Sequence, residues 1–267
     1  MIQKISKLNF SFFSIYPFSN MVFVTKSLFE LYSTEHFNEF RQRFFHTLIF
    51  FFLSFLILFA NIKLIVQILE NPVLNVKFFQ FSPGEYFLST LKISFSSGLL
   101  FLIPFLLNQI LFFFFPALDE KQKKILFILF INSILLFLGS LFFSYFLLIP
   151  AALNFFINYS IDVIEPLWSF EPYFEFVSSL FLSTGLVFQI PIILIVLSLS
   201  KLINPTIIFN YWRFMLFFST LLGAILTPSA DPVTQLILSV ALFFLYISGS
   251  LISIFLLKKN YELQLKL

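Results

Sequence analysis

The sequence predicts an all-helical integral membrane protein with six transmembrane helices. Hydrophobic residues make up 60% of its 267 residues, its mean hydropathy is +1.00, and only 11% of its residues are charged. A soluble domain is about half apolar and about a quarter charged, so a single soluble core of this length cannot bury so much apolar surface. The chain has no cysteine, which excludes disulfides, thiolate metal sites and a cysteine nucleophile.

Six apolar runs are separated by segments that contain proline, glycine or charged residues. We predict transmembrane spans at about 44–60, 87–115, 125–149, 173–199, 214–226 and 233–257. The third span is expected to stop at Pro150, Pro104 is expected to kink the second, and Pro191 lies inside the fourth. The fifth is short, roughly 20 Å of helix, unless residues 207–212 extend it.

The chain divides into three parts on this prediction. Residues 1–33 form a poorly ordered extension without a clean signal-peptide pattern, residues 34–257 form the membrane domain, and residues 258–267 form a tail. Thr34 is predicted to cap the helix that leads into the first span. Residues 151–172 are predicted to be a loop.

Lysine and arginine residues predict the orientation of the spans. Six spans place both termini on one side, and all but three of the 16 Lys and Arg residues lie on that side, the exceptions being Lys63, Lys77 and Lys92. The termini are therefore predicted to face the cytoplasm, or the stroma or matrix of an organelle.

A dense mixture of charged and aromatic residues stands at 34–44, directly before the first span. Read as a helix, this segment has an apolar stripe of phenylalanines, and it places Glu39 and Arg43 one turn apart on another face. Glu39 can therefore pair with Arg43 or turn its carboxylate toward an outside cation.

His36 and the run Glu39-Phe40-Arg41-Gln42-Arg43 resemble the amino-terminal His-x-x-Glu-Leu-Arg-x-Arg signature of TatC, the polytopic receptor subunit of the twin-arginine protein translocase. Phe40 stands in the place of Leu. Further segments resemble the family in the same order and cover the chain to about Leu257: Ser82–Phe87 with Lys92; Asn108, Gln109, Phe113 and Pro116–Leu118; Gly139, Phe143, Tyr145 and Pro150; Tyr173, Phe176, Gly185, Phe188, Gln189 and Pro191; Arg213 and Thr227–Gln235.

The resemblance implies a receptor for twin-arginine signal peptides of folded precursor proteins. Such a subunit nucleates a translocation complex with single-span TatA- and TatB-type partners, is driven by the proton gradient, performs no enzymatic step and needs no cofactor. It implies an assembly with further copies of itself in the lipid bilayer and no nucleic-acid partner. The form of the turn at 227–235 is typical of plastid and cyanobacterial members, which favours the thylakoid membrane over a mitochondrial inner or bacterial plasma membrane.

The family pattern also implies which residues bind the signal peptide. A guanidinium presents a planar fork that a carboxylate can meet with two bonds. The residues implied are Glu39, Arg41, Arg43, Phe113, Glu120 and Gln122. Where the family usually has a glutamate on the first cytoplasmic loop, between the second and third spans, this chain has Gln122, and Glu120 two residues earlier is the other candidate.

Further polar residues carry two interpretations each. Gln189 stands where the family often has a glutamate; it is either part of a hydrated site for a partner or substrate, or a buried structural amide. Thr227, Asp231 and Gln235 are implied to dock the partner subunits, although Asp231 at the start of the sixth span can equally be a helix cap.

A secondary transporter is the alternative function. That class is expected to show internal repeats and polar helices at the membrane midplane, whereas this sequence has no repeat and almost no midplane charge. His36 and His46 are the only histidines, and both lie near the predicted cytoplasmic edge. No metalloprotease or serine-hydrolase motif is present, so the sequence does not favour an enzyme.

Overall fold

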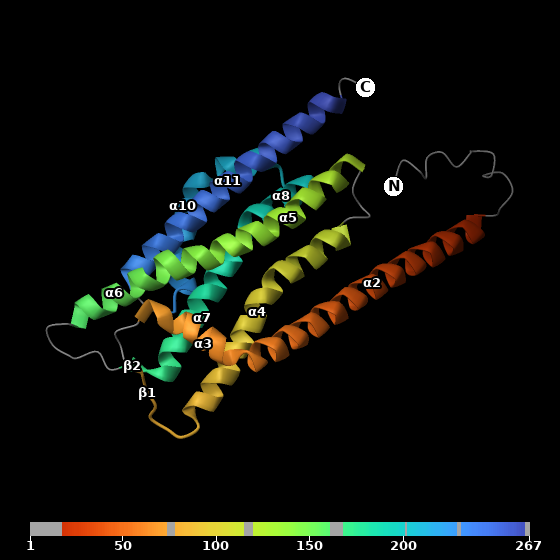
Figure 1. The fold of residues 1–267 in the computed structure, drawn as a ribbon. Helices are drawn as coiled ribbons and strands as arrows, with labels where there is room; N and C mark the ends of the chain where they lie inside the picture. Colours follow the sequence, from red (N-terminus) through yellow and green to blue (C-terminus); the bar gives the residue numbers. More distant parts are fainter. Residues whose placement is uncertain are drawn as a thin grey trace.

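The computed structural model describes residues 18–73, 78–114, 120–160, 168–200, 202–228 and 231–264, and nearly all of them are helical (Figure 1). The elements in chain order are α2 (Phe18–Ala60), α3 (Ile62–Glu70), η2 (Asn71–Val73), β1 (Phe78–Phe79), α4 (Glu85–Phe114), α5 (Glu120–Phe143), η4 (Ser144–Leu148), α6 (Ile149–Ser160), β2 (Trp168–Ser169), α7 (Phe170–Val187), α8 (Ile190–Leu199), α9 (Pro205–Asn210), α10 (Trp212–Leu226) and α11 (Pro232–Gln264).

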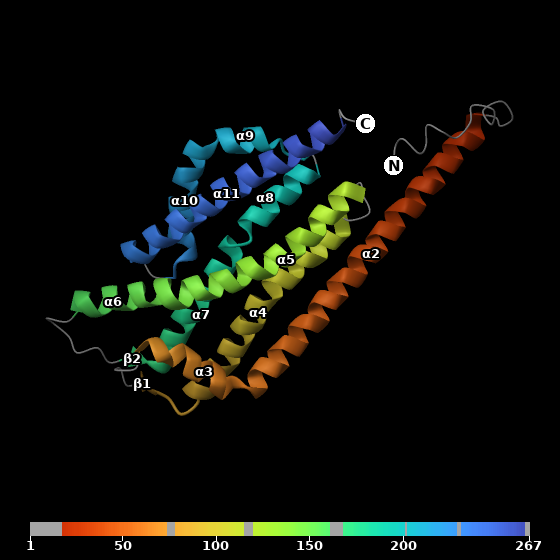
Figure 2. The ribbon, with the colours of Figure 1, turned by 45° about the horizontal axis from the view of Figure 1, so that its top comes forward.

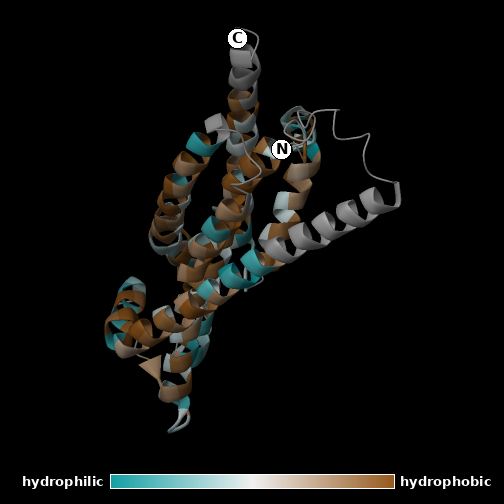
Figure 3. Cartoon of the chain, turned by 90° about the vertical axis from the view of Figure 1, so that its right-hand side faces the viewer, coloured by the Kyte–Doolittle hydropathy of each residue, from teal (hydrophilic) through white to brown (hydrophobic). Residues whose placement is uncertain are grey.

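Among the described residues, five helical segments are long and apolar enough to cross a membrane, and they lie in α2, in α4, in α5 with α6, in α7 with α8, and in α11. A shorter apolar helix, α10, stands where the fifth of the six spans was expected. Figure 3 shows hydrophobic residues along these helices. The beginning of α2 and the end of α11 lie at the same end of the bundle (Figure 1), which is compatible with the predicted topology. The all-helical membrane class is confirmed, and the count of six spans and the three-part division stay predictions.

α2 is one helix of 43 residues, so the expected cap at Thr34 is wrong. Thr34 lies within a helix that begins at Phe18, because no proline or glycine stands between them to interrupt it. α2 packs along α4, where the rings of Phe50 and Phe105 stack with their centroids 4.1 Å apart. Gly98 of α4 admits this close approach, because a Cβ there would come within 3.3 Å of a ring atom of the neighbouring α2.

The third span continues through Pro150, contrary to prediction. α5, the π-helical turn η4 and α6 follow one another without a gap, so residues 151–160 of the expected loop are helical. Proline lacks the N–H that an α-helix needs, and its ring clashes with the carbonyl four residues earlier. A π turn widens the helix directly before Pro150 and accommodates the ring.

The fourth span, expected as one run from about Tyr173 to Leu199 with Pro191 inside, is broken into two helices. α7 ends at Val187 and α8 begins at Ile190, with Gln189 in the break. α11 crosses directly against it, because a Cβ on Gly249 would lie only 2.7 Å from Cα of Pro191. This contact packs the start of α8 against α11.

α9 and α10 meet at Tyr211 with a change of direction that Figure 2 shows clearly. Residues 207–212 therefore do not extend the fifth span as one straight helix. α10 has 15 residues, about 22 Å of helix against a hydrocarbon core of about 30 Å. The hydroxyl of Tyr246 on α11 donates to the carbonyl of Ile208 at 2.5 Å and holds α9 against the bundle.

α3 and β1, between the first two spans, lie at the end of the bundle opposite the chain ends (Figure 1). β1 pairs in parallel with β2. The buried carboxylate of Glu85 fastens the beginnings of α4 and α7 to this layer: it accepts hydrogen bonds from the backbone N–H groups of Phe81, Ser82 and Glu171 and from the hydroxyl of Ser169, at 2.6 to 3.3 Å. These four donors satisfy a carboxylate that has no ion pair with any described residue.

Candidate functional site

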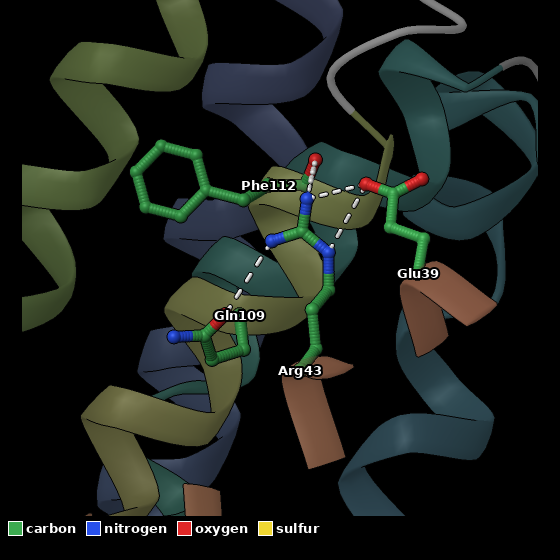
Figure 4. A network of polar contacts seen from close by, with 4 residues as sticks. All are labelled: Glu39, Arg43, Gln109 and Phe112. Atoms are coloured by element: carbon green, nitrogen blue, oxygen red, sulfur yellow. Dashed lines mark hydrogen bonds and ion pairs between the residues drawn. The ribbon is translucent and has the colours of Figure 1, made fainter. Parts of the chain in front are cut away.

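Glu39 and Arg43 form an ion pair that is tied to the end of α4 (Figure 4). Nη2 of Arg43 lies 2.6 Å from Oε1 of Glu39, and Nε donates to the same oxygen at 3.3 Å. The guanidinium also donates to Oε1 of Gln109 at 3.4 Å and to the backbone carbonyl of Phe112 at 3.2 Å. Arg43 therefore joins α2 to α4 and holds the carboxylate of Glu39 in place.

The positions of these partners follow from helix geometry. Glu39 and Arg43 are four residues apart, so their side chains are neighbours on α2. Phe112 belongs to the last turn of α4, where carbonyl groups have no partner within the helix. A guanidinium, with five donors in a rigid fork, can satisfy such a carbonyl while it keeps its carboxylate partner.

Only one of the two oxygens of Glu39 is used. Among the residues that the structure describes, Oε2 receives no hydrogen bond, and in Figure 4 it points away from Arg43. The side chain of Glu39 is 31% exposed and that of Arg43 is 24% exposed. The two sequence alternatives for Glu39 are thus compatible, because the internal pair leaves half of the carboxylate available.

The other residues implied for the signal-peptide site divide by position. The edge of one ring of the Phe40–Phe113 pair meets the face of the other at a centroid distance of 6.5 Å, which places Phe113 beside the ion pair. Arg41 is exposed, so it can meet a ligand without breaking a contact in the fold. Glu120 begins α5, but its side chain and that of Gln122 lie outside the part of the chain that the structure describes, so the choice between them stays a prediction.

Gln189 is buried in the break between α7 and α8. Its Oε1 accepts from the hydroxyl of Ser133 at 2.9 Å, and its Nε2 donates to the carbonyl of Ser133 at 3.3 Å. These two hydrogen bonds to Ser133 of α5 are the contacts expected of a buried structural amide.

The hairpin between α10 and α11 shows a capped helix. The carboxylate of Asp231 accepts from the N–H of Thr234 at 2.9 Å and also from its hydroxyl. Thr227 is buried, and its hydroxyl donates to the carbonyl of Gly223 on its own helix. Gln235 donates through Nε2 to the carbonyl of Thr220 at 3.4 Å, and its Oε1 accepts no hydrogen bond among the described residues.

Residues 35–240 match the family model described as Sec-independent protein translocase protein (TatC). The chain belongs to the TatC family. It is 55% identical over 232 residues to the TatC-like protein ycf43 of Trieres chinensis, which covers 86% of this chain and 87% of that protein. It is 41% identical over 218 residues to the chloroplastic Sec-independent protein translocase protein TATC of Pisum sativum, over 81% of this chain and 62% of that one.

The fold agrees with the family. A crystal structure of the twin arginine translocase receptor TatC superimposes with a TM-score of 0.70 at 30% identity, over 82% of this chain and 97% of that one. TatC proteins are components of a protein translocase and transport proteins rather than catalytic enzymes. The plastid-type relatives and the apolar helices support an integral protein of the thylakoid membrane, as the sequence predicted.

Two residues that contact Arg43 were not among the site residues predicted from the sequence, namely Gln109 and Phe112. Gln109 entered the sequence analysis only as part of a segment that resembles the family, and the structure shows that Arg43 donates to it. The carbonyl of Phe112 carries no signal in the sequence, since every residue has one. Ser133 is a small polar residue within an apolar run and carries no signal in the sequence; the fold places it beside Gln189.

Proposed function

We propose that this chain is the receptor subunit of a twin-arginine translocase and that it binds signal peptides at the ends of α2 and α4. The observation that carries the proposal is the free oxygen of Glu39. Arg43 holds Oε1 at 2.6 Å, and Oε2 remains accessible to a second guanidinium. A carboxylate shared in this way keeps its orientation before the ligand arrives, which lowers the entropy lost on binding.

The second arginine of the signal peptide needs a partner of its own. α4 ends close to the site, since Phe113 near its end packs on Phe40. Glu120, the first residue of α5, is the carboxylate that we propose for this role. Lysine at either position of the peptide would supply charge without the planar fork, so paired arginines are favoured.

Partner subunits are proposed to dock at the α10–α11 hairpin. α10 is shorter than the hydrocarbon core, and a short span either thins the bilayer or packs against another helix. Gln235 offers an unused amide oxygen there, whereas Thr227 is buried and already bonded, so Gln235 is the stronger candidate contact.

Binding of a fluorescent twin-arginine peptide to the purified protein tests the recognition site. Glu39→Gln keeps the shape of the side chain but loses its charge, and a hydrogen bond to a charged group contributes about 1.5–3 kcal/mol. We expect binding to weaken about tenfold or more, with the twin-lysine version of the peptide weak on both proteins.

Glu70→Gln is the matched control, because it makes the same change on α3 at the other end of the bundle. It should leave peptide binding unchanged. Equal affinity of the Glu39→Gln variant and the unchanged protein would remove Glu39 from the site.

A further inference from the structure

A cavity with charged, hydroxyl and apolar lining residues lies between α2, α4 and α7, near the start of α4 and far along that helix from Gln109. It has a volume of about 430 Å³. Its polar lining residues are Ser89, Lys92 and Ser96 from α4 and Glu171, Glu175 and Ser178 from α7. Each set recurs every three or four residues, so one face of each helix lines the cavity.

The cavity carries a net negative charge. Nζ of Lys92 lies 2.5 Å from Oε1 of Glu171, so this ammonium already has its counter-charge. Glu175, one turn further along α7, is exposed; it interacts electrostatically with the ammonium of Lys92 but forms no ion pair among the described residues. Charged side chains are rare in membrane helices because they are costly there, and they mark a functional site by default. The charge favours a ligand that donates hydrogen bonds and disfavours an anion.

Ser89 supplies a second, independent observation. Its side chain is only 1% exposed, and among the described residues its Oγ has no hydrogen-bond partner. The neighbouring hydroxyls of Thr90 and Ser94 both donate to carbonyl groups of α4 at 2.8 Å. Since buried hydroxyl groups are normally paired, the unpaired one of Ser89 indicates a ligand group in the cavity that it lines.

A second, apolar cavity of about 490 Å³ meets the first at Ser96 and Ser178, which line both. Most of its other lining side chains are apolar, among them Leu58, Leu100 and Phe181. The two cavities together therefore have a charged, hydroxyl-lined part and a hydrocarbon-lined part. This division matches a molecule with a polar head and an aliphatic tail.

We propose that the two cavities hold one neutral glycolipid, with its sugar beside Ser89, Lys92 and Glu175 and an acyl chain in the apolar cavity. Sugar hydroxyl groups donate to a carboxylate and also accept from an ammonium or a hydroxyl, so one headgroup can satisfy all three side chains. A choline headgroup has no N–H or O–H to donate. An anionic headgroup would meet two carboxylates and only one ammonium, which is already paired.

This site is independent of the peptide site at Glu39, since the two share no residue. The test uses the full chain in nanodiscs of phosphatidylcholine that contain equal minor fractions of monogalactosyldiacylglycerol, phosphatidylethanolamine and phosphatidylglycerol. Native mass spectrometry of the protein released from the discs measures which lipid stays bound. We expect the galactolipid to be retained in preference to the other two.

Variants locate the lipid in the cavity. Combining Ser89→Ala with Glu175→Ala should lower galactolipid retention about tenfold, the effect of losing one hydrogen bond to a charged group. Ser89→Ala breaks no hydrogen bond within the described protein, so its melting temperature in lipid-free detergent should not fall. Ser179→Ala is the matched control, because Ser179 is the neighbour of Ser178, lines neither cavity and bonds only to its own helix.

The outcomes that overturn the proposal are equally specific. Equal retention of the three lipids, preference for phosphatidylglycerol, or preference for phosphatidylethanolamine would each reject a sugar headgroup. Undiminished retention by the double variant would place the galactolipid elsewhere on the protein. None of these results bears on peptide binding at Glu39, which is measured separately.

Discussion

Replacing Arg43 with lysine separates two roles that the ion pair could play. If Arg43 positions Glu39 for the ligand, loss of its fork should weaken peptide binding. If it only competes with the ligand for the carboxylate, the change should leave binding equal or improve it. Arg43→Lys keeps the positive charge, so long-range electrostatics are the same in both proteins and only the contact geometry differs.

The size of the effect follows from the contacts of Arg43. An ammonium can retain the 2.6 Å contact with Glu39, but it cannot at the same time reach Gln109 and Phe112 as the guanidinium does. The two lost bonds, at 3.4 and 3.2 Å, are long, so each is assigned the low end of the usual range, about 0.5–1 kcal/mol. Together they contribute about 1.4 kcal/mol. If all of this free energy serves to hold Glu39 in its binding orientation, its loss weakens peptide binding tenfold.

Fluorescence anisotropy with a labelled twin-arginine peptide gives the dissociation constant for each variant. Arg213→Lys is the matched control, because it makes the same substitution on α10, where Arg213 lies against the ring of Trp212 instead of in the peptide site. Unchanged or tighter binding by Arg43→Lys, with Arg213→Lys also silent, would refute the positioning role.

Three further predictions concern other parts of the chain. Gly249→Ala adds a Cβ 2.7 Å from the backbone of α8, and this overpacking should cost about 1–3 kcal/mol, seen as a lower melting temperature with peptide affinity little changed in the folded fraction. Glu120→Gln should weaken peptide crosslinking while Gln122→Glu does not improve it; the reverse pattern would mean that the chain has lost the loop carboxylate of its family. Thr227→Leu combined with Gln235→Leu should lower copurification of a single-span partner and spare peptide binding at the other end of the bundle, and full retention of the partner would make the hairpin a structural turn only.

The sequence predicted the membrane helices well because apolar run length is a direct consequence of bilayer thickness. It failed where the outcome depends on how a local conflict is resolved. Pro150 was expected to end the third span, yet a π turn absorbs the proline and the helix continues to Ser160. Pro191 was placed inside the fourth span without a predicted break, and there the chain does break, with Gly249 packed on Pro191. Proline has two different effects because the neighbouring structure differs at the two positions. Rules that consider one residue at a time take no account of that neighbouring structure.

The sequence also predicted only part of the proposed peptide site. Spacing alone made Glu39 and Arg43 partners, and it left open whether that pairing would consume the carboxylate. The answer depends on Gln109 and Phe112, which lie more than sixty residues further along the chain and reach Arg43 only in the fold. Because these α4 partners share the guanidinium, it can lie to one side of Glu39 and leave Oε2 open.

Gln189 shows what the structure adds to a departure from the family pattern. Its amide forms two bonds of opposite sense with one residue: Oε1 accepts from the hydroxyl of Ser133, and Nε2 donates to the carbonyl of Ser133. An ionised carboxylate can only accept hydrogen bonds. A glutamate at this position would keep the hydrogen bond from the Ser133 hydroxyl, but it would place an oxygen against the Ser133 carbonyl, where the amide now donates. A buried amide therefore suits this helix break better than a buried charge, because the amide satisfies Ser133 without the desolvation that ionisation would require. The neutral side chain of Gln189 is therefore consistent with a structural role, in which it links the break in the fourth span to α5.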